Sequence, residues 1–134
     1  MTDKELYFEA VKAMENSYSP YSSCKVGAAL LTKSGKLFTG TNIENAAYTP
    51  TICAERVAFF KAVNSGERDF VKIAVVGGKR GEDISSLCAP CGVCRQVMAE
   101  FGDPKEFRIL VAKSATDYKE YVLKDLLPES FALL

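Results

Sequence analysis

The sequence contains no histidine among its 134 residues. This absence excludes a Ser-His-Asp triad, a Cys-His nucleophile pair and every metal site that needs an imidazole ligand. If the chain performs acid–base chemistry near neutral pH, the proton must be carried by a carboxylate, lysine, cysteine or tyrosine with a suitably shifted pKa.

The sequence also has no net charge, because its 17 basic residues balance 17 acidic ones. The chain therefore lacks the basic surface that binding to a nucleic-acid polymer requires. No uncharged apolar run approaches the roughly 20 residues of a membrane span, and the first residues do not resemble a signal peptide. We expect a soluble, cytoplasmic protein that acts on a small molecule and has no membrane partner.

Helical and strand-like hydrophobic patterns alternate along the chain, which has the length of one domain and is 48% hydrophobic. The first helix is marked by the capping-box spacing of Thr2 and Glu5. This alternation predicts a single α/β layered domain over residues 1–134. The expected elements are a helix over 3–16, a hairpin of strands 26–31 and 36–41, a helix over 52–63, a strand over 71–76, a helix over 91–101, strands over 108–112 and 118–122, and a helical turn over 122–127.

The cysteines form the most informative pattern, because clustered thiols in a reducing compartment indicate a metal site or catalysis. Cys91 and Cys94 form a Cys-x2-Cys pair at one expected helix start, and Cys53 lies at another. Three ligands leave the fourth position of a zinc ion open, and a nearby carboxylate such as Glu55 can then move protons. The spacing predicts one catalytic Zn²⁺ per chain, bound by Cys53, Cys91 and Cys94.

Cys88 leaves two non-enzymatic alternatives open. With Cys91 and Cys94 it repeats the Cys-x2-Cys spacing found in iron–sulfur proteins, or it could supply a fourth thiolate that closes a structural zinc site. Neither alternative explains Glu55 or the Asn-rich segment 42–48.

Two segments resemble the signature of the zinc-dependent cytidine deaminase family. They are Cys-Ala-Glu-Arg at 53–56 and Pro-Cys-Gly-Val-Cys-Arg-Gln at 90–96, the all-cysteine form of a pattern known for zinc deaminases. The resemblance is to the small homotetrameric members, and it covers nearly the whole chain. It implies a three-layer α/β/α fold with a mixed, roughly five-stranded sheet and a single cytidine deaminase domain. Further matching segments are 18–22, 26–30, 42–48 and 126–128, with Phe131.

The implied activity is that of a hydrolase of cyclic amidines in pyrimidine salvage. It would convert cytidine and deoxycytidine to uridine and deoxyuridine with release of ammonia, and Glu55 would move protons between water, ring N3 and the departing amine. Asn42 and Glu44 would bind the ribose, with Glu44 on the 3′-hydroxyl, and the backbone of Ala54 would contact the base.

The resemblance also implies a homotetramer with shared active sites. Ala46 and Tyr48 would line the nucleoside site, and Tyr48 and Phe131 would reach the pocket of a neighbouring subunit. Because three thiolates outweigh the charge of zinc, Arg56 would return some acidifying power by donating hydrogen bonds to the sulfurs, with Gln96 as a second donor.

Cys24 departs from the family pattern, which usually has an aromatic residue at this position. A smaller side chain would loosen the packing around a nucleoside, so the alternative substrate is a modified cytosine nucleoside such as a nucleoside antibiotic. The expected ribose contacts do not read the 2′-position, and the sequence therefore does not separate cytidine from deoxycytidine.

Overall fold

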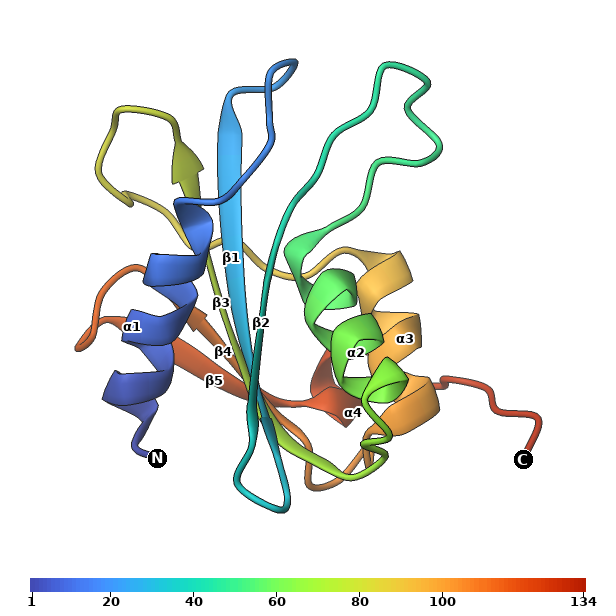
Figure 1. Ribbon diagram of the computed structural model, residues 1–134. Helices are drawn as coiled ribbons and strands as arrows, with labels where there is room; N and C mark the ends of the chain where they lie inside the picture. The colour runs from blue at the N-terminus through green and yellow to red at the C-terminus, as the bar shows by residue number, and fades with distance from the viewer.

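The computed structural model describes all 134 residues and contains a five-stranded sheet with helices on both faces (Figure 1). The first helix begins with the expected capping box, in which the side chains of Thr2 and Glu5 each accept the other residue's backbone N–H. In chain order the elements are α1 Asp3–Met14, β1 Cys24–Thr32, β2 Leu37–Thr41, α2 Ala54–Asn64, β3 Phe70–Lys79, α3 Gly92–Phe101, β4 Arg108–Ala112, β5 Tyr118–Val122 and α4 Leu123–Leu126.

The sheet is mixed, with strand order β2-β1-β3-β4-β5. Strands β3 and β4 are parallel, and the other neighbours are antiparallel. The predicted hairpin is confirmed, because Ala29 of β1 pairs with Thr39 of β2. On its other side β1 pairs with β3, which makes these two strands the centre of the sheet.

Helix α1 packs on one face of the sheet, while α2, α3 and α4 lie on the other (Figure 1). Successive residues of a strand point to opposite faces, so Leu30 packs with Phe59 of α2 while Ala29 packs with Leu6 of α1. The predicted three-layer α/β/α architecture is therefore confirmed. None of the helices combines the length and the apolarity needed to cross a bilayer.

Two glycines allow the helices to approach the sheet closely. A Cβ at Gly27 would lie 2.0 Å from the carbonyl oxygen of Ala10 in α1, and one at Gly40 would lie 2.2 Å from that of Ala54 in α2. No side chain fits at either position. Gly40 therefore fixes the first turn of α2 directly against the edge of the sheet.

Several predicted boundaries shift by one to three residues, and three of these shifts concern the cysteines or the central strand β3. The helices expected from 52 and 91 begin at Ala54 and Gly92, because Cys53 and Cys91 have extended backbone angles and serve as N-caps. The strand expected to end at 76 continues to Lys79, because the two glycines after Val76 pair with β1. Pairing along the whole length of β1 overrides the tendency of glycine to end a strand.

Candidate active site

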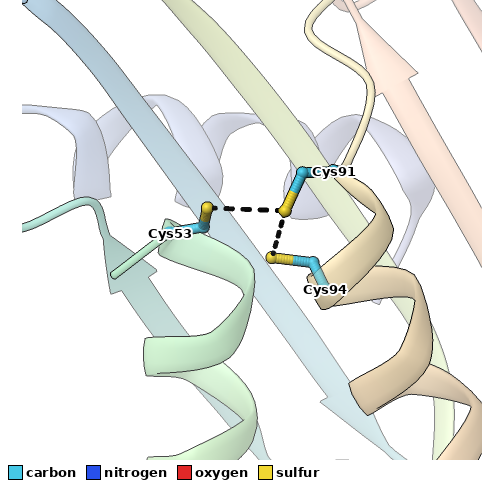
Figure 2. A group of neighbouring side chains, drawn as sticks. All are labelled: Cys53, Cys91 and Cys94. Carbon is cyan, nitrogen blue, oxygen red and sulfur yellow. Dashed lines mark hydrogen bonds between the residues drawn. The ribbon is translucent and has the colours of Figure 1, made fainter. Parts of the chain in front are cut away.

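Three sulfur atoms meet where the N-termini of α2 and α3 converge (Figure 2). The Sγ atom of Cys91 lies 3.8 Å from that of Cys53 and 3.5 Å from that of Cys94, and all three lie within 4.8 Å of one another. Sulfurs bound to one tetrahedral zinc ion at 2.3 Å are separated by about 3.8 Å. The three cysteines therefore fit a zinc ion by donor type and by spacing.

The cluster sits at the positive ends of two helix dipoles. Cys53 and Cys91 are N-caps whose side chains make no capping hydrogen bond, so their sulfurs stay available as ligands. The hydrogen bond with Cys94 and those from Arg56 and Cys91 lower the pKa of Cys53 to about 5, although burial opposes them. These hydrogen bonds favour the thiolate form of Cys53, which is the form that binds metal.

Glu55 lies in the first turn of α2 beside the cluster, and its side chain is only 4% exposed. Burial raises the pKa of this carboxyl to about 7, and the negative charge of Cys53 adds to the effect. Its own backbone N–H and the Cys94 thiol oppose the shift. A carboxyl group with a pKa near the working pH can both accept and release a proton.

Arg56 donates a hydrogen bond from Nη2 to the Sγ atom of Cys53 at 3.4 Å. Its Nε atom is buried and has no hydrogen-bond partner, so the guanidinium keeps a further donor next to the sulfurs. Gln96 makes no hydrogen bond to the cluster. It follows Cys94 by two residues on α3, and residues at this spacing do not share a helix face. Its expected role stays a prediction.

Cys88 does not belong to the three-sulfur cluster. It packs over Gly77, where an added Cβ would lie 2.7 Å from its sulfur, and burial raises the pKa of its thiol to about 11. Cys88 and Cys24 line the same pocket of about 330 Å³. The two cysteines left unexplained by the metal pattern thus lie together outside the ligand group, which contains no fourth thiolate.

Asn42 is buried, with 8% of its surface exposed. Its Oδ1 atom accepts hydrogen bonds from the backbone N–H of Val26 at 2.9 Å and from the hydroxyl of Ser17 at 2.5 Å. Its Nδ2 atom donates to the carbonyl oxygen of Cys24 at 2.8 Å. One N–H of the amide is left without a protein partner.

Glu44 is held by the turn that precedes β1. Its carboxylate accepts from the backbone N–H groups of Tyr21 and Ser22, at 2.9 and 3.2 Å, and from the Ser22 hydroxyl. The Ser22 hydroxyl is the main cause that lowers the pKa of Glu44, with contributions from both backbone bonds and from the charge of Arg80. Glu44 is therefore an anion near neutral pH and has room to accept one more hydrogen bond.

The serines that hold these two side chains were not predicted from the sequence. Residues 17–21 contain a proline and indicate only a break between two elements. The one signal for this segment was the resemblance of residues 18–22 to the deaminase family. That resemblance gave no role to Ser17 or Ser22.

The remaining expected nucleoside residues lie in different environments. Ala54 is fully buried at the start of α2, and Ala46 is exposed in the loop before it. Tyr48 is 78% exposed and lines a pocket of about 290 Å³ together with Glu44. Phe131 is 68% exposed on the C-terminal segment, which runs away from the body of the molecule (Figure 1).

Comparison with known proteins agrees with this geometry. Residues 1–110 match the family model of the cytidine and deoxycytidylate deaminase zinc-binding region. A cytidine deaminase from Halalkalibacterium halodurans is 46% identical over 98% of this chain and 95% of its own, and one from Sporosarcina psychrophila is 44% identical over 98% and 93%. The crystal structure of a cytidine deaminase from Burkholderia pseudomallei is 45% identical, covers 98% of this chain and all of the other, and superposes with a TM-score of 0.88.

Proposed function

The chain belongs to the cytidine and deoxycytidylate deaminase family, and we propose that it hydrolyses cytidine and deoxycytidine to uridine and deoxyuridine with release of ammonia, as a zinc-dependent enzyme of pyrimidine salvage. The observation that carries this proposal is the buried carboxyl of Glu55 beside three cysteine sulfurs suited to zinc. The placement of Cys88 outside the cluster speaks against an iron–sulfur or closed structural zinc site.

Cys53, Cys91 and Cys94 would hold the zinc ion, which when bound supplies a Lewis acid that makes water nucleophilic at neutral pH. Glu55 takes a proton from the attacking water and delivers it to ring N3 of the base. It then takes the second proton, from the hydroxyl that has added to C4, and passes it to the amine, which leaves as ammonia. Arg56 draws electron density from the Cys53 thiolate through its hydrogen bond, which keeps the electrophilic power of the site higher than three free thiolates would allow.

Recognition of the sugar depends on the donor and acceptor positions of Asn42 and Glu44 that the protein itself does not use. After their contacts with the protein, Asn42 retains one N–H donor and Glu44 retains one acceptor position. One hydroxyl group can satisfy both, because it accepts one hydrogen bond and donates another. We assign this hydroxyl to the 3′-position of the ribose.

We also propose that residues 1–134 form one deaminase domain.

The function is tested by following the ultraviolet absorbance of cytidine and deoxycytidine with the purified protein, alongside metal analysis. We expect both nucleosides to be consumed and one zinc ion per chain. A zinc-containing protein that leaves both nucleosides intact but deaminates a modified cytosine nucleoside would favour the alternative substrate.

Removal of the 3′-hydroxyl is expected to impair the reaction much more than removal of the 2′-hydroxyl. A hydrogen bond to a charged group such as Glu44 is worth about 1.5–3 kcal/mol, so kcat/KM for 3′-deoxycytidine should be roughly 10- to 100-fold below that for cytidine. Deoxycytidine should stay within a few-fold of cytidine. The same assay on Glu44→Ala should erase the preference, and equal rates for the 3′-deoxy and parent nucleosides in the unaltered protein would contradict the assignment.

A homotetramer with shared active sites is the assembly we propose. Tyr48 and Phe131 are strongly exposed, and the family resemblance has both rings reach the pocket of a neighbouring subunit, where they would be covered. Light scattering should therefore give the mass of four chains.

We also place the enzyme in the cytoplasm, because all five cysteines are free and a thiolate site is favoured by a reducing compartment.

Complementation between an inactive and an impaired variant tests the sharing of active sites. Glu55→Gln lacks the proton carrier, and Phe131→Ala lacks the ring offered to the neighbouring pocket, a contact worth roughly tenfold in rate. Mixed oligomers of the two variants contain pockets with both residues intact. Their activity should exceed that of either parent, whereas activity equal to the average of the parents, or an active monomer, would refute shared sites.

A further inference from the structure

Apart from the backbone N–H of Val26, the groups that hold Asn42 and Glu44 come from one short segment, residues 17–24. Ser17 donates to Asn42, and Tyr21 and Ser22 donate to Glu44. The Ser22 hydroxyl also accepts from the backbone N–H of Cys24 at 3.0 Å, which ties the turn to the start of β1. The orientation of the two side chains therefore depends on the conformation of this segment.

That conformation includes a strained residue. Ser23 has a φ of 61°, in the left-handed region that residues other than glycine rarely occupy. Such a conformation persists only when surrounding contacts fix it. One of these contacts is internal, since the backbone N–H of Ser23 donates to the carbonyl oxygen of Ser19 at 3.1 Å.

The other contacts come from Arg80, which directly follows β3. Its backbone N–H donates to the carbonyl oxygen of Ser23 at 2.7 Å, and its Nη2 atom donates to the carbonyl oxygen of Ser19 at 2.9 Å. Arg80 thus holds the segment at both ends of the strained turn. Together with Ser23, it fills both acceptor positions of the buried Ser19 carbonyl.

We propose that Arg80 is a positioning residue for the ribose, because its guanidinium fixes the turn from which Tyr21 and Ser22 bind Glu44. The inference rests on the proposed function, since it concerns how that site recognises its nucleoside. Arg80 acts through Glu44 and makes no contact with the substrate. Its loss should therefore affect only nucleosides that carry the hydroxyl bound by Glu44.

The test compares cytidine with 3′-deoxycytidine in the zinc-loaded enzyme and its Arg80→Ala variant. The variant keeps the backbone hydrogen bond to Ser23 but loses the side-chain bond to Ser19. We expect kcat/KM for cytidine to fall about tenfold, mainly through a higher KM, while that for 3′-deoxycytidine stays within about twofold. Zinc content should not change.

Two further variants sharpen the comparison. Arg80→Lys should recover part of the lost activity, because its ammonium can still donate to the Ser19 carbonyl. Arg68→Ala is the matched control, since the Arg68 side chain also binds two backbone carbonyls, those of Val63 and Glu67, at the far end of α2. It should behave as the unaltered enzyme with both nucleosides.

The outcomes separate the two proposals. An equal loss with both nucleosides, or no loss with cytidine, would overturn the role of Arg80 while leaving the deaminase activity established. Failure of the unaltered enzyme to deaminate cytidine would remove the proposed function instead. If Arg80→Ala does not fold, Arg80→Gln is measured in its place, and the same comparison of the two nucleosides decides.

Discussion

Replacing Glu55 by glutamine should remove nearly all deaminase activity and leave zinc bound. Glutamine keeps the size and the hydrogen-bonding reach of the side chain but cannot take up and release a proton. A positioned acid–base group is usually worth roughly 10²–10⁴ in rate, and the loss of turnover should reach at least that range because Glu55 serves more than one step. The measurement is kcat for cytidine together with zinc content.

The control for this variant is Glu100→Gln, which makes the same change at an exposed position near the end of α3. It should retain both zinc and activity. Cytidine should still bind to Glu55→Gln, because Asn42 and Glu44 are unchanged, and this can be measured by calorimetry without turnover. A Glu55→Gln protein that deaminates cytidine at close to the normal rate would exclude Glu55 from the mechanism, and a chain without histidine offers no obvious substitute.

Replacement of any one of Cys53, Cys91 and Cys94 by alanine should deplete the protein of zinc. Loss of an outer hydrogen-bond partner of a metal ligand typically costs 10- to 100-fold in metal affinity or activity, and loss of a ligand should cost more than roughly 100-fold. Metal analysis after gel filtration gives the zinc content, and the nucleoside assay gives the activity.

Cys88→Ala is the matched variant, because it removes a half-buried thiol that lies outside the ligand group. Zinc content and activity should both be retained. Loss of zinc from Cys88→Ala would show that Cys88 is a ligand and would overturn the assignment of an open catalytic site.

The cluster could be predicted from the sequence because its chemistry is carried by residues close together along the chain. Cys91 and Cys94 lie within one helical turn, and Glu55 and Arg56 lie within three residues of Cys53, so spacing alone brings them to two helix starts. What spacing could not give was the exact start of each helix. Each of these helices begins one residue after a cysteine that serves as its N-cap. The sequence could not show this, because the extended backbone of an N-cap has no distinct hydrophobic pattern.

The support around the ribose site could not be predicted in the same way. Ser17 and Ser22 reach partners 25 and 22 residues further along the chain, and Arg80 reaches back 61 residues to Ser19. Contacts of this range depend on how β1 pairs with β2 and with β3, and a polar segment carries no periodic signal of its partners. The neighbouring positions of Cys24 and Cys88 are another product of this pairing.

The three sulfurs also join parts of the chain that are distant in sequence, since Cys53 and Cys91 are 38 residues apart. A metal ion that binds both closes a loop of this length, in the manner of a covalent cross-link. In the chain-entropy treatment, a cross-link over such a loop disfavours the unfolded ensemble by about 4 kcal/mol. The ion that enables the chemistry therefore also cross-links the starts of α2 and α3 and stabilises the folded domain. Removal of the ion by a chelator should lower the melting temperature as well as the activity.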